Sequence, residues 1–332
     1  MPRAICLGET MAMLTPGGRG SLETADSLHL GVGGAESNVA LGLAAMGVST
    51  EWVSRLGADG FGRRIRNELE RHRVGTRGVQ LDEARPTGLY VKVPGDADSG
   101  TGMLYYRSGS AASAMSPALL DDPEVAAVVA DAGLIHLSGI TAALSDSCRD
   151  LLLELLSRPR RSGQRISFDV NWRPALWKGR DSSVLQRLAD LSDIVLMGKD
   201  EALLAFGTDD EGRLRELLPT PEVLIIKNES TSAIALERDG ARQEVPALSV
   251  DVVEPVGAGD SFAAGYLSGV LSGLDQRLSL RRGHVAAACT LTVHGDRGPL
   301  PDDEDLDHIL RCSDEEWASL RVTQGRFLVG QA

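Results

Sequence analysis

Short apolar segments alternate with helical segments through the second half of this chain, and this rhythm constrains the fold more than any other feature. Four apolar segments are rich in Ile, Val and Leu, and we expect them to be strands: residues 134–140, 166–170, 194–197 and 223–227. Strands that are apolar along their whole length are typical of a parallel sheet covered by helices on both faces. The pattern predicts an α/β fold with its functional site at the carboxyl ends of the strands.

The first half of the chain predicts a small additional sheet. Residues 4–14 are expected to form a buried strand that runs into a turn at Gly8, and two β-rich stretches farther on resemble a hairpin outside the main sheet. We interpret residues 1–312 as a single α/β domain, with a β lid contributed mainly by about residues 10–30 and 87–107. Residues 313–332 are interpreted as a C-terminal extension of unknown role.

The last third is expected to hold a closing hairpin and two buried helices. Residues 233–246 predict the hairpin, with its turn at Asp239-Gly240. Residues 262–271 and 284–292 are apolar and rich in small side chains, which favours closely packed helices. We expect the acidic C-terminus to be irregular.

Composition excludes several classes of function. The 332 residues carry a formal net charge of −13, which argues against nucleic acid and anionic membranes as partners. No apolar run approaches the ~20 residues of a membrane span, and the N-terminus lacks a signal-peptide pattern, so we expect a cytoplasmic protein. The four cysteines are scattered without a C-x-x-C pair, which argues against a disulfide framework or a cysteine metal site.

A glycine-rich turn at residues 256–262, Val-Gly-Ala-Gly-Asp-Ser-Phe, is the strongest candidate for a site. It lies between a β-branched segment and a predicted helix, so backbone N–H groups and the helix dipole would favour an anion there. The carboxylate of Asp260 would repel a bound phosphate unless it takes a proton from a hydroxyl that attacks the phosphoryl group. The alternative is a plain turn in which Asp260 caps the helix.

Two common nucleotide signatures are missing. The sequence holds no Walker A loop, and Phe262 stands where a dinucleotide fingerprint would need its third glycine. An NAD-dependent oxidoreductase is therefore disfavoured, and a phosphotransferase would need another phosphate cradle.

Two stretches together resemble the ribokinase-like carbohydrate kinases of the phosphofructokinase-B family. One is residues 33–40, Gly-Gly-Ala-Glu-Ser-Asn-Val-Ala, followed by the glycine-rich residues 56–62; the other is residues 256–265. The resemblance implies a three-layer α/β sandwich with a mostly parallel central sheet and a small β-sheet lid. It also implies that Gly257, Ala258 and Gly259 form the anion hole for the transferred phosphate, and that Asp260 is the catalytic base.

The substrate is read from other positions. Tyr105-Tyr106-Arg107, and Asp169-Val170-Asn171-Trp172-Arg173-Pro174, are similar to the 2-keto-3-deoxygluconate kinase branch, in which the Tyr and the two Arg hold a sugar acid. Guanidinium groups bind carboxylates in bidentate fashion, which suits that role. The resemblance adds these substrate contacts: Gly33, Gly34, Asn38, Tyr90 and Asp260. The alternatives are an ordinary exposed strand at Tyr105 and Arg107 and a surface charge at Arg173, and fructokinases share the pattern around Arg173.

The nucleotide and metal positions depart from the family pattern. The resemblance places ATP against these residues: Asn171, Lys199, Lys227, Glu229, Ser232, Gly257 and Gly259. Glu229 and Ser232 replace the two glycines of the nucleotide loop, and Gly198 replaces the Asn of an Asn-x-x-Glu pattern. Glu201 of that pattern would act on Mg²⁺ through water. Glu254 replaces an Asp that helps to bind a monovalent cation, so dependence on that cation is left open.

We therefore expect an ATP-dependent kinase that phosphorylates the terminal primary hydroxyl of a sugar acid, with 2-keto-3-deoxygluconate as the first choice. A helix N-terminus would lower the pKa of Asp260 below ~3.9, which would leave it ionised but weakly basic. The alternatives are a fructokinase or another neutral-sugar kinase of the same fold, and a non-catalytic sugar or nucleotide sensor. By resemblance, the β lid is expected to pair subunits in a homo-oligomer.

Overall fold

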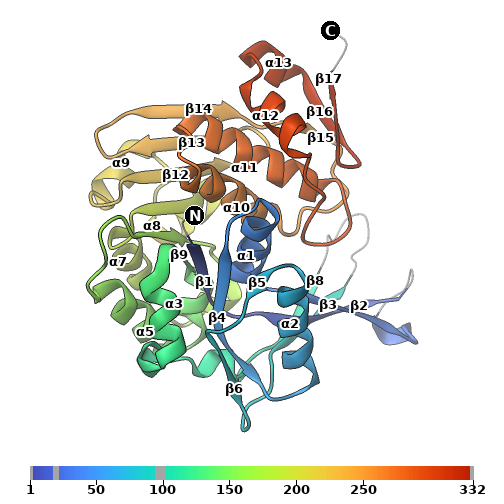
Figure 1. Cartoon of the computed structure of the whole chain (residues 1–332), viewed down its shortest axis with the longest axis vertical. Coiled ribbons are helices and arrows are strands. Elements are labelled where there is room, and N and C mark those ends of the chain that lie inside the picture. Colours follow the sequence, from blue (N-terminus) through green and yellow to red (C-terminus); the bar gives the residue numbers. More distant parts are fainter. Residues whose placement is uncertain (1–2, 18–21, 94–101, 330–332) are drawn as a thin grey trace.

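The computed structural model describes residues 3–17, 22–93 and 102–329, and a ten-stranded sheet lies at its centre (Figure 1). The strand order is β14-β13-β12-β11-β10-β9-β1-β4-β5, with β6 beside β4. The strands from β5 to β12 pair in parallel, whereas β13 and β14 are antiparallel. Their bounds are β1 Arg3–Leu7, β4 Thr50–Gly57, β5 Val74–Gly75, β6 Val79–Asp82, β9 Ala132–Ser138, β10 Arg165–Asp169, β11 Ile194–Gly198, β12 Val223–Asn228, β13 Ser232–Glu237 and β14 Arg242–Pro246.

Helices cover both faces of this sheet. Successive residues of β1 alternate between two cores, since Ala4 and Cys6 belong to one apolar cluster and Ile5 and Leu7 to the other. The first cluster includes α1 (Ala35–Ala45), α2 (Gly60–Arg71), α10 (Ala258–Leu271) and α11 (Gln276–Leu291). The second includes α3 (Pro123–Asp131), α4 (Gly139–Leu144), α5 (Asp146–Ser157), α6 (Pro174–Trp177), α7 (Val184–Asp190), α8 (Lys199–Phe206) and α9 (Glu211–Leu217). The predicted three-layer α/β fold is confirmed.

A four-stranded sheet projects from one side of the main body, and we call it the lid (Figure 1). Its order is β3-β2-β7-β8, with bounds β2 Met11–Pro16, β3 Leu28–Gly33, β7 Leu89–Val93 and β8 Gly102–Tyr106. The chain leaves the main sheet at Gly8 and enters the lid at Met11, so the segment predicted as one strand belongs to two sheets. The expected hairpin of β7 and β8 is present, and its turn lies outside the described residues.

The C-terminal segment is ordered, and the expectation of an irregular terminus is wrong. It forms α12 (Asp303–Arg311), α13 (Asp314–Ser319), β16 (Leu320–Thr323) and β17 (Arg326–Val329), and β15 (Ser249–Val250) completes a three-stranded sheet with the last two. Asp302 and Ser313 cap the two helices, because each side chain accepts a backbone N–H in the first turn. Trp317 is 1% exposed, its Nε1 donates to the carbonyl of Pro246 at 2.9 Å, and the Arg281 guanidinium lies 4.6 Å from its ring centre.

We predict that Trp317→Ala lowers the free energy of unfolding by about 3–5 kcal/mol, because it opens a large cavity between the terminal segment and the core. The matched control is Leu328→Ala on β17, which removes a side chain that is 48% exposed and should cost less than about 0.5 kcal/mol. Urea denaturation of the two variants measures both values. Equal stability of the two variants would show that the terminal segment does not share the core.

Candidate active site

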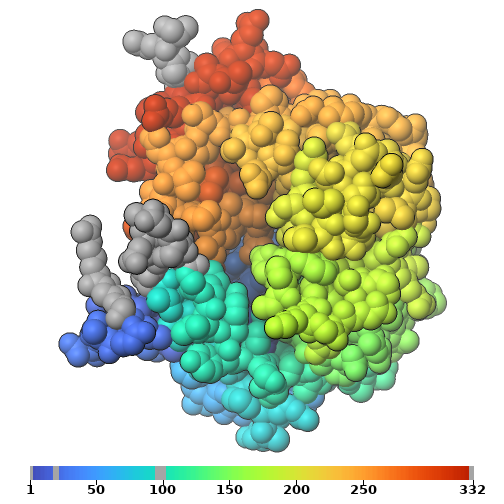
Figure 2. Space-filling model, turned by 180° about the vertical axis from the view of Figure 1, so that it is seen from behind, coloured from blue at the N-terminus to red at the C-terminus, as the bar shows by residue number. Residues whose placement is uncertain are grey.

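A cavity of about 570 Å³ lies at the carboxyl ends of the parallel strands, between the lid and the N-terminus of α10. Figure 2 shows the molecule hollowed between the teal segment around β8, the yellow-green segment around residues 170–200 and the orange segment around residues 250–270. Most of the predicted site residues line it: Gly33, Gly34, Asn38, Tyr90, Tyr105, Arg107, Asn171, Arg173, Glu201, Lys227, Gly257, Gly259 and Asp260. The lining does not include Ala258, Lys199, Glu229 or Ser232.

The turn at Gly257 begins α10 and fixes the floor of the cavity. Gly257 has φ 84°, a left-handed conformation that disfavours other residues, and a Cβ there would lie 2.6 Å from the carbonyl oxygen of Asp296. A Cβ on Gly259 would lie 3.8 Å from the Lys227 ammonium. The positive end of a 14-residue helix and a lysine therefore face the same point, which suits a phosphate oxygen.

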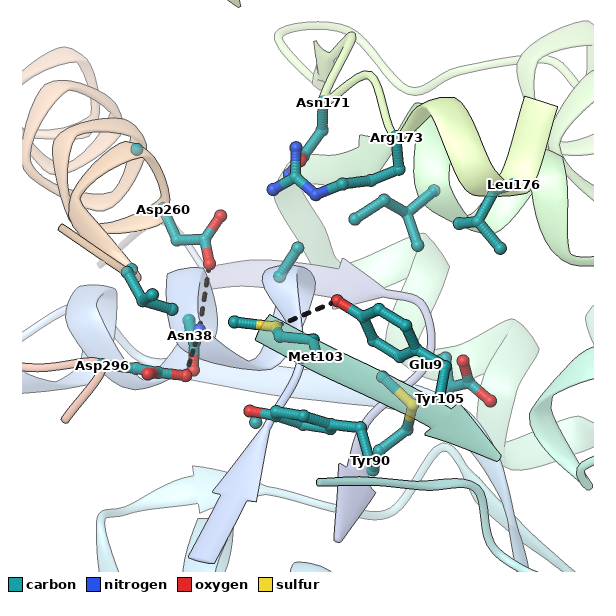
Figure 3. A pocket seen from close by; sticks show the side chains of 18 of the residues that line it. Glu9, Asn38, Tyr90, Met103, Tyr105, Asn171, Arg173, Leu176, Asp260 and Asp296 are labelled. Atoms are coloured by element: carbon teal, nitrogen blue, oxygen red, sulfur yellow. Dashed lines mark hydrogen bonds between the residues drawn. The ribbon is translucent and has the colours of Figure 1, made fainter. Parts of the chain in front are cut away.

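Asp260 stands in the first turn of α10 and points toward Asn38 (Figure 3). Its carboxylate borders the cavity and is partly accessible, but it is surrounded by protein on its other sides. Burial raises the pKa of Asp260 to about 7, the nearby carboxylates of Asp169 and Asp296 also raise it, and Asn38 and Arg173 oppose the shift. The predicted lowering of this pKa is wrong, because desolvation outweighs the helix dipole.

Asn38 joins two carboxylates across the cavity floor. Its Nδ2 donates to Asp260 Oδ2 at 2.9 Å and lies 3.5 Å from Asp296 Oδ2 (Figure 3). Asn38 is placed by α1, which begins directly after Gly34, and a Cβ on Gly34 would lie 2.4 Å from the carbonyl oxygen of Glu9. The Gly-Gly-x-x-x-Asn spacing thus brings the helix close enough for its amide to orient the candidate base.

The lid contributes aromatic and cationic side chains to the cavity. The rings of Tyr90 and Tyr105 lie 5.7 Å apart, and the Arg107 guanidinium lies 5.6 Å from the centre of the Tyr105 ring. Burial and the carboxylate of Asp296 raise the pKa of Tyr90, so its hydroxyl stays protonated and can donate a hydrogen bond. A Cβ on Gly33 would meet this hydroxyl at 2.2 Å, which explains the glycine.

Arg107 is held by a carboxylate that the sequence analysis missed. Glu9, which is fully buried, contacts both Nε and Nη2 of Arg107 and also accepts from the Ser110 hydroxyl at 2.7 Å. One edge of the guanidinium is therefore taken, and the two Nη1 hydrogens and the second Nη2 hydrogen are the donors left for a ligand. Arg173 is placed differently, since its side chain is 47% exposed and its nearest carboxylate, Glu201, lies 3.7 Å away.

The predicted nucleotide residues lie in two groups. Lys227 pairs with Asp169 at 3.1 Å inside the cavity; burial works against its charge, but Asp169 and Glu201 outweigh burial and raise the pKa of Lys227. Outside the cavity, the Ser232 hydroxyl donates to Glu244 at 2.6 Å. This bond and Arg242 lower the pKa of Glu244, with a smaller effect from Lys199, which places Lys199 near the same group.

Two residues of the predicted nucleotide site have left-handed backbone. Glu229, at the position of the first missing glycine, has φ 45°, and Asn171 has φ 40°. Left-handed backbone costs an ordinary residue about 1–2 kcal/mol, whereas Asn adopts it more readily. Glu229 therefore has a left-handed backbone of the kind that glycine adopts most readily.

The described residues offer no preformed metal site. Glu201 accepts from the backbone N–H of Gly198 at 2.7 Å, and within the described ranges no group of three or more His, Cys, Asp or Glu could hold a metal ion. Mg²⁺ would fit here only as part of a metal–nucleotide complex, held mainly by phosphate oxygens and water.

Glu9, Lys92, Asp169 and Asp296 are charged residues in or beside the cavity to which the sequence analysis gave no role. Glu9 follows the first strand and Asp169 ends another, so the rule that sites gather at carboxyl strand ends could have identified both. Asp296 lies in a loop after α11, and no local pattern around it indicates a site.

The comparisons with known proteins agree with this geometry. A family model described as pfkB family carbohydrate kinase matches residues 1–303. A 2-dehydro-3-deoxygluconokinase of Bacillus subtilis is 34% identical over 91% of this chain and 94% of its own. A 2-dehydro-3-deoxygalactonokinase of Haloferax volcanii is 32% identical over 93% and 97%. A probable fructokinase of Arabidopsis thaliana is 27% identical over 91% and 81%.

Solved structures show the same architecture. An uncharacterized sugar kinase from Pyrococcus horikoshii in complex with ATP is 25% identical, with a TM-score of 0.77 over 94% of this chain and 98% of the other. In the part of this chain that the structure describes, no helix is long and apolar enough to cross a membrane. The match across residues 1–303, together with relatives above 30% identity along nearly their whole length, shows that this chain belongs to the pfkB family of carbohydrate kinases.

Proposed function

We propose that this kinase transfers the γ-phosphoryl group of ATP to the terminal primary hydroxyl of 2-keto-3-deoxygluconate and forms the 6-phosphate. The proposal rests on the different chemical groups that lie on two sides of the cavity. Asp260 and the N-terminus of α10 lie together on one side, while Arg107, Tyr90 and Tyr105 project from the lid. A sugar acid has a hydroxyl for the first group and a carboxylate for the second. Two relatives named for dehydro-deoxy sugar acids support this choice.

Asp260 acts as the general base in this mechanism. Its carboxylate takes the proton of the sugar hydroxyl while the hydroxyl oxygen forms a bond to the γ-phosphorus and the bond to the β-phosphate oxygen breaks. A pKa of about 7 suits a base that works near neutral pH. The backbone N–H groups of Gly257, Ala258 and Gly259 and the Lys227 ammonium stabilise the charge on the transferred group.

The nucleotide would lie along the loops that follow β10, β11 and β12. Asn171, Lys199, Lys227, Glu229 and Ser232 are the proposed contacts, with the phosphates directed toward Gly257 and Gly259. ATP supplies the phosphoryl group, and Mg²⁺ would neutralise its phosphate oxygens, with Glu201 acting through water.

A cytoplasmic location and a homo-oligomer that pairs through the lid stay predictions. The exposed lid residues Leu30, Leu104 and Tyr106 are compatible with such pairing.

We predict that Asp260→Asn lowers kcat by about 10²–10⁴-fold, because general-base help is lost while the shape of the cavity is kept. The KM for the sugar acid should change little, since the contacts to its carboxylate remain. Steady-state kinetics and calorimetric binding of the sugar acid measure the two effects. The control is Glu216→Gln on the exposed surface of α9, which should leave both constants unchanged. Full turnover by the Asn variant would exclude Asp260 as the base and would be the first sign of a different mechanism.

A change at Arg107 distinguishes a sugar acid from a neutral sugar as the substrate. Replacing Arg107 should raise the KM for 2-keto-3-deoxygluconate roughly 10–100-fold, the value of a hydrogen bond to a charged group, and should hardly alter the KM for fructose. The change is made in the double variant Glu9→Gln/Arg107→Gln, so that no buried carboxylate is left unpaired. Arg173→Gln should also raise the KM for the sugar acid, but it does not distinguish the two substrates, because fructokinases share the pattern around Arg173. Arg180→Gln, which is exposed on the segment that follows α6, is the control.

Two alternatives predict other results. A neutral-sugar kinase such as a fructokinase would turn over fructose faster than the acid and would lose little with the change at Glu9 and Arg107. A non-catalytic sensor would bind sugar or nucleotide without consuming ATP with any sugar or sugar acid. An ATP-turnover screen over 2-keto-3-deoxygluconate, its galactonate epimer and fructose distinguishes all three.

A further inference from the structure

Lys92 reaches from the lid to two buried carboxylates beneath the Gly257 turn. These are Glu254 and Asp296, which we call the acidic group. The ammonium of Lys92 contacts the carboxylate of Glu254 and lies 3.6 Å from Asp296 Oδ1, and the lysine side chain is 7% exposed. Glu254 lies in the segment before α10, and Asp296 lies in the loop after α11. Lys92 is two residues from Tyr90 on β7, so one face of this strand serves both the cavity and the acidic group.

The acidic group needs a positive charge. The side chains of Glu254 and Asp296 are only 12% and 8% exposed, and a carboxylate removed from water is costly unless a cation or several hydrogen bonds compensate it. Glu254 also accepts the backbone N–H of Gly295 at 3.1 Å, and His294 lies 3.8 Å away on the surface. Among the described residues, Lys92 is the cation that contacts both carboxylates.

Glu254 stands at the position where, by resemblance, the family binds a monovalent cation, and the sequence left open whether this chain depends on one. An ion bound by Glu254 would need the side of the carboxylate that the Lys92 ammonium already contacts. A bound cation and the Lys92 ammonium, both in contact with the Glu254 carboxylate, would repel each other strongly in a buried site. The residues present therefore do not fit a bound monovalent cation, and the ammonium of Lys92 fits the charge of the site by itself.

This charge is connected to the reacting groups through Asp296. One oxygen of Asp296 faces Lys92, and the other lies 3.5 Å from Asn38 Nδ2, the amide that donates to Asp260. The backbone of Asp296 packs against Gly257, where an added Cβ would meet its carbonyl oxygen at 2.6 Å. Displacement of Asp296 would therefore disturb both the orientation of Asp260 and the turn at the phosphate site.

We propose that Lys92 is a positioning residue that supplies, from the lid, the fixed positive charge beneath the Gly257 turn, so that phosphoryl transfer needs no monovalent cation. The inference rests on the proposed roles of that turn and of Asp260. It also gives the lid a second task, because the strand that touches the sugar also carries the charge that holds the phosphate turn.

The test compares wild type with Lys92→Met in potassium chloride, ammonium chloride and choline chloride at constant ionic strength. Wild type should show the same kcat and the same melting temperature in all three salts. In choline chloride, Lys92→Met should lose at least about tenfold in kcat, since a buried carboxylate is left unpaired. Potassium or ammonium should restore part of kcat and raise the melting temperature of this variant, because a small cation can then enter the acidic group. Lys92→Arg should keep the behaviour of wild type.

Lys92→Met/Glu254→Gln is the matched control, because it removes the uncompensated charge together with Lys92. It should melt higher than Lys92→Met in choline chloride and should show no response to potassium. If Lys92→Met does not fold, the salt dependence of wild type and of this double variant decides the question.

Two results would overturn the proposal: wild type that potassium activates or stabilises relative to choline, or Lys92→Met that equals wild type in choline chloride. Melting temperatures keep this test separate from the assignment of the base. If Asp260→Asn retains turnover while Lys92→Met becomes potassium-dependent in its melting, the role of Lys92 stands and the role of Asp260 falls.

Discussion

The hydrogen bond from Asn38 to Asp260 connects residues of α1 and α10 that are 222 positions apart in the sequence, and the proposed role of Asp260 depends on it. Asp260 can serve as a base only if its carboxylate is turned toward a substrate hydroxyl and away from the phosphate. Close packing of α1 on α10 makes this possible, since a Cβ on Gly42 would lie 2.6 Å from that of Ala264. The small residues of α10 thus serve the geometry of the site as well as the core.

Burial disfavours the ionised form of the carboxylates in this cavity, and positive or polar neighbours favour it. Asp169, Asp260 and Asp296 all lie along its wall, and each of the three has a positive or polar neighbour: Lys227, Asn38 and Lys92. The balance leaves Asp260 with a pKa of about 7, high enough to accept a proton and low enough for about half of the molecules to carry the ionised base at neutral pH. Arg107 shows the same principle, because Glu9 compensates it before any substrate arrives.

Local patterns predicted the fold and most of the cavity wall, and long-range electrostatics accounts for what they missed. Apolar runs identified the strands, and the glycines of the two signatures identified α1 and α10, because these features depend on neighbouring residues. Lys92 and Asp296 contact partners more than 90 positions away, and no local spacing in the sequence indicates such contacts. The pKa of Asp260 was misjudged for the same reason, since the helix dipole is local whereas the enclosing cavity is not. The C-terminal strands β16 and β17 form a local hairpin with a two-residue turn at Gln324-Gly325, where both residues have positive φ, and this local signal was overlooked.

The most direct test of the central claim is the pH dependence of kcat/KM for the sugar acid. The base must be ionised, and below its pKa it is protonated, so kcat/KM should rise about tenfold per pH unit below pH 7 and level off above it. We predict that the pH profile of the wild type has its midpoint near 7. The residual activity of Asp260→Asn should show no such midpoint. A profile that stays flat down to pH 5 would contradict the account, because an enclosed Asp260 with a raised pKa could not then be the base.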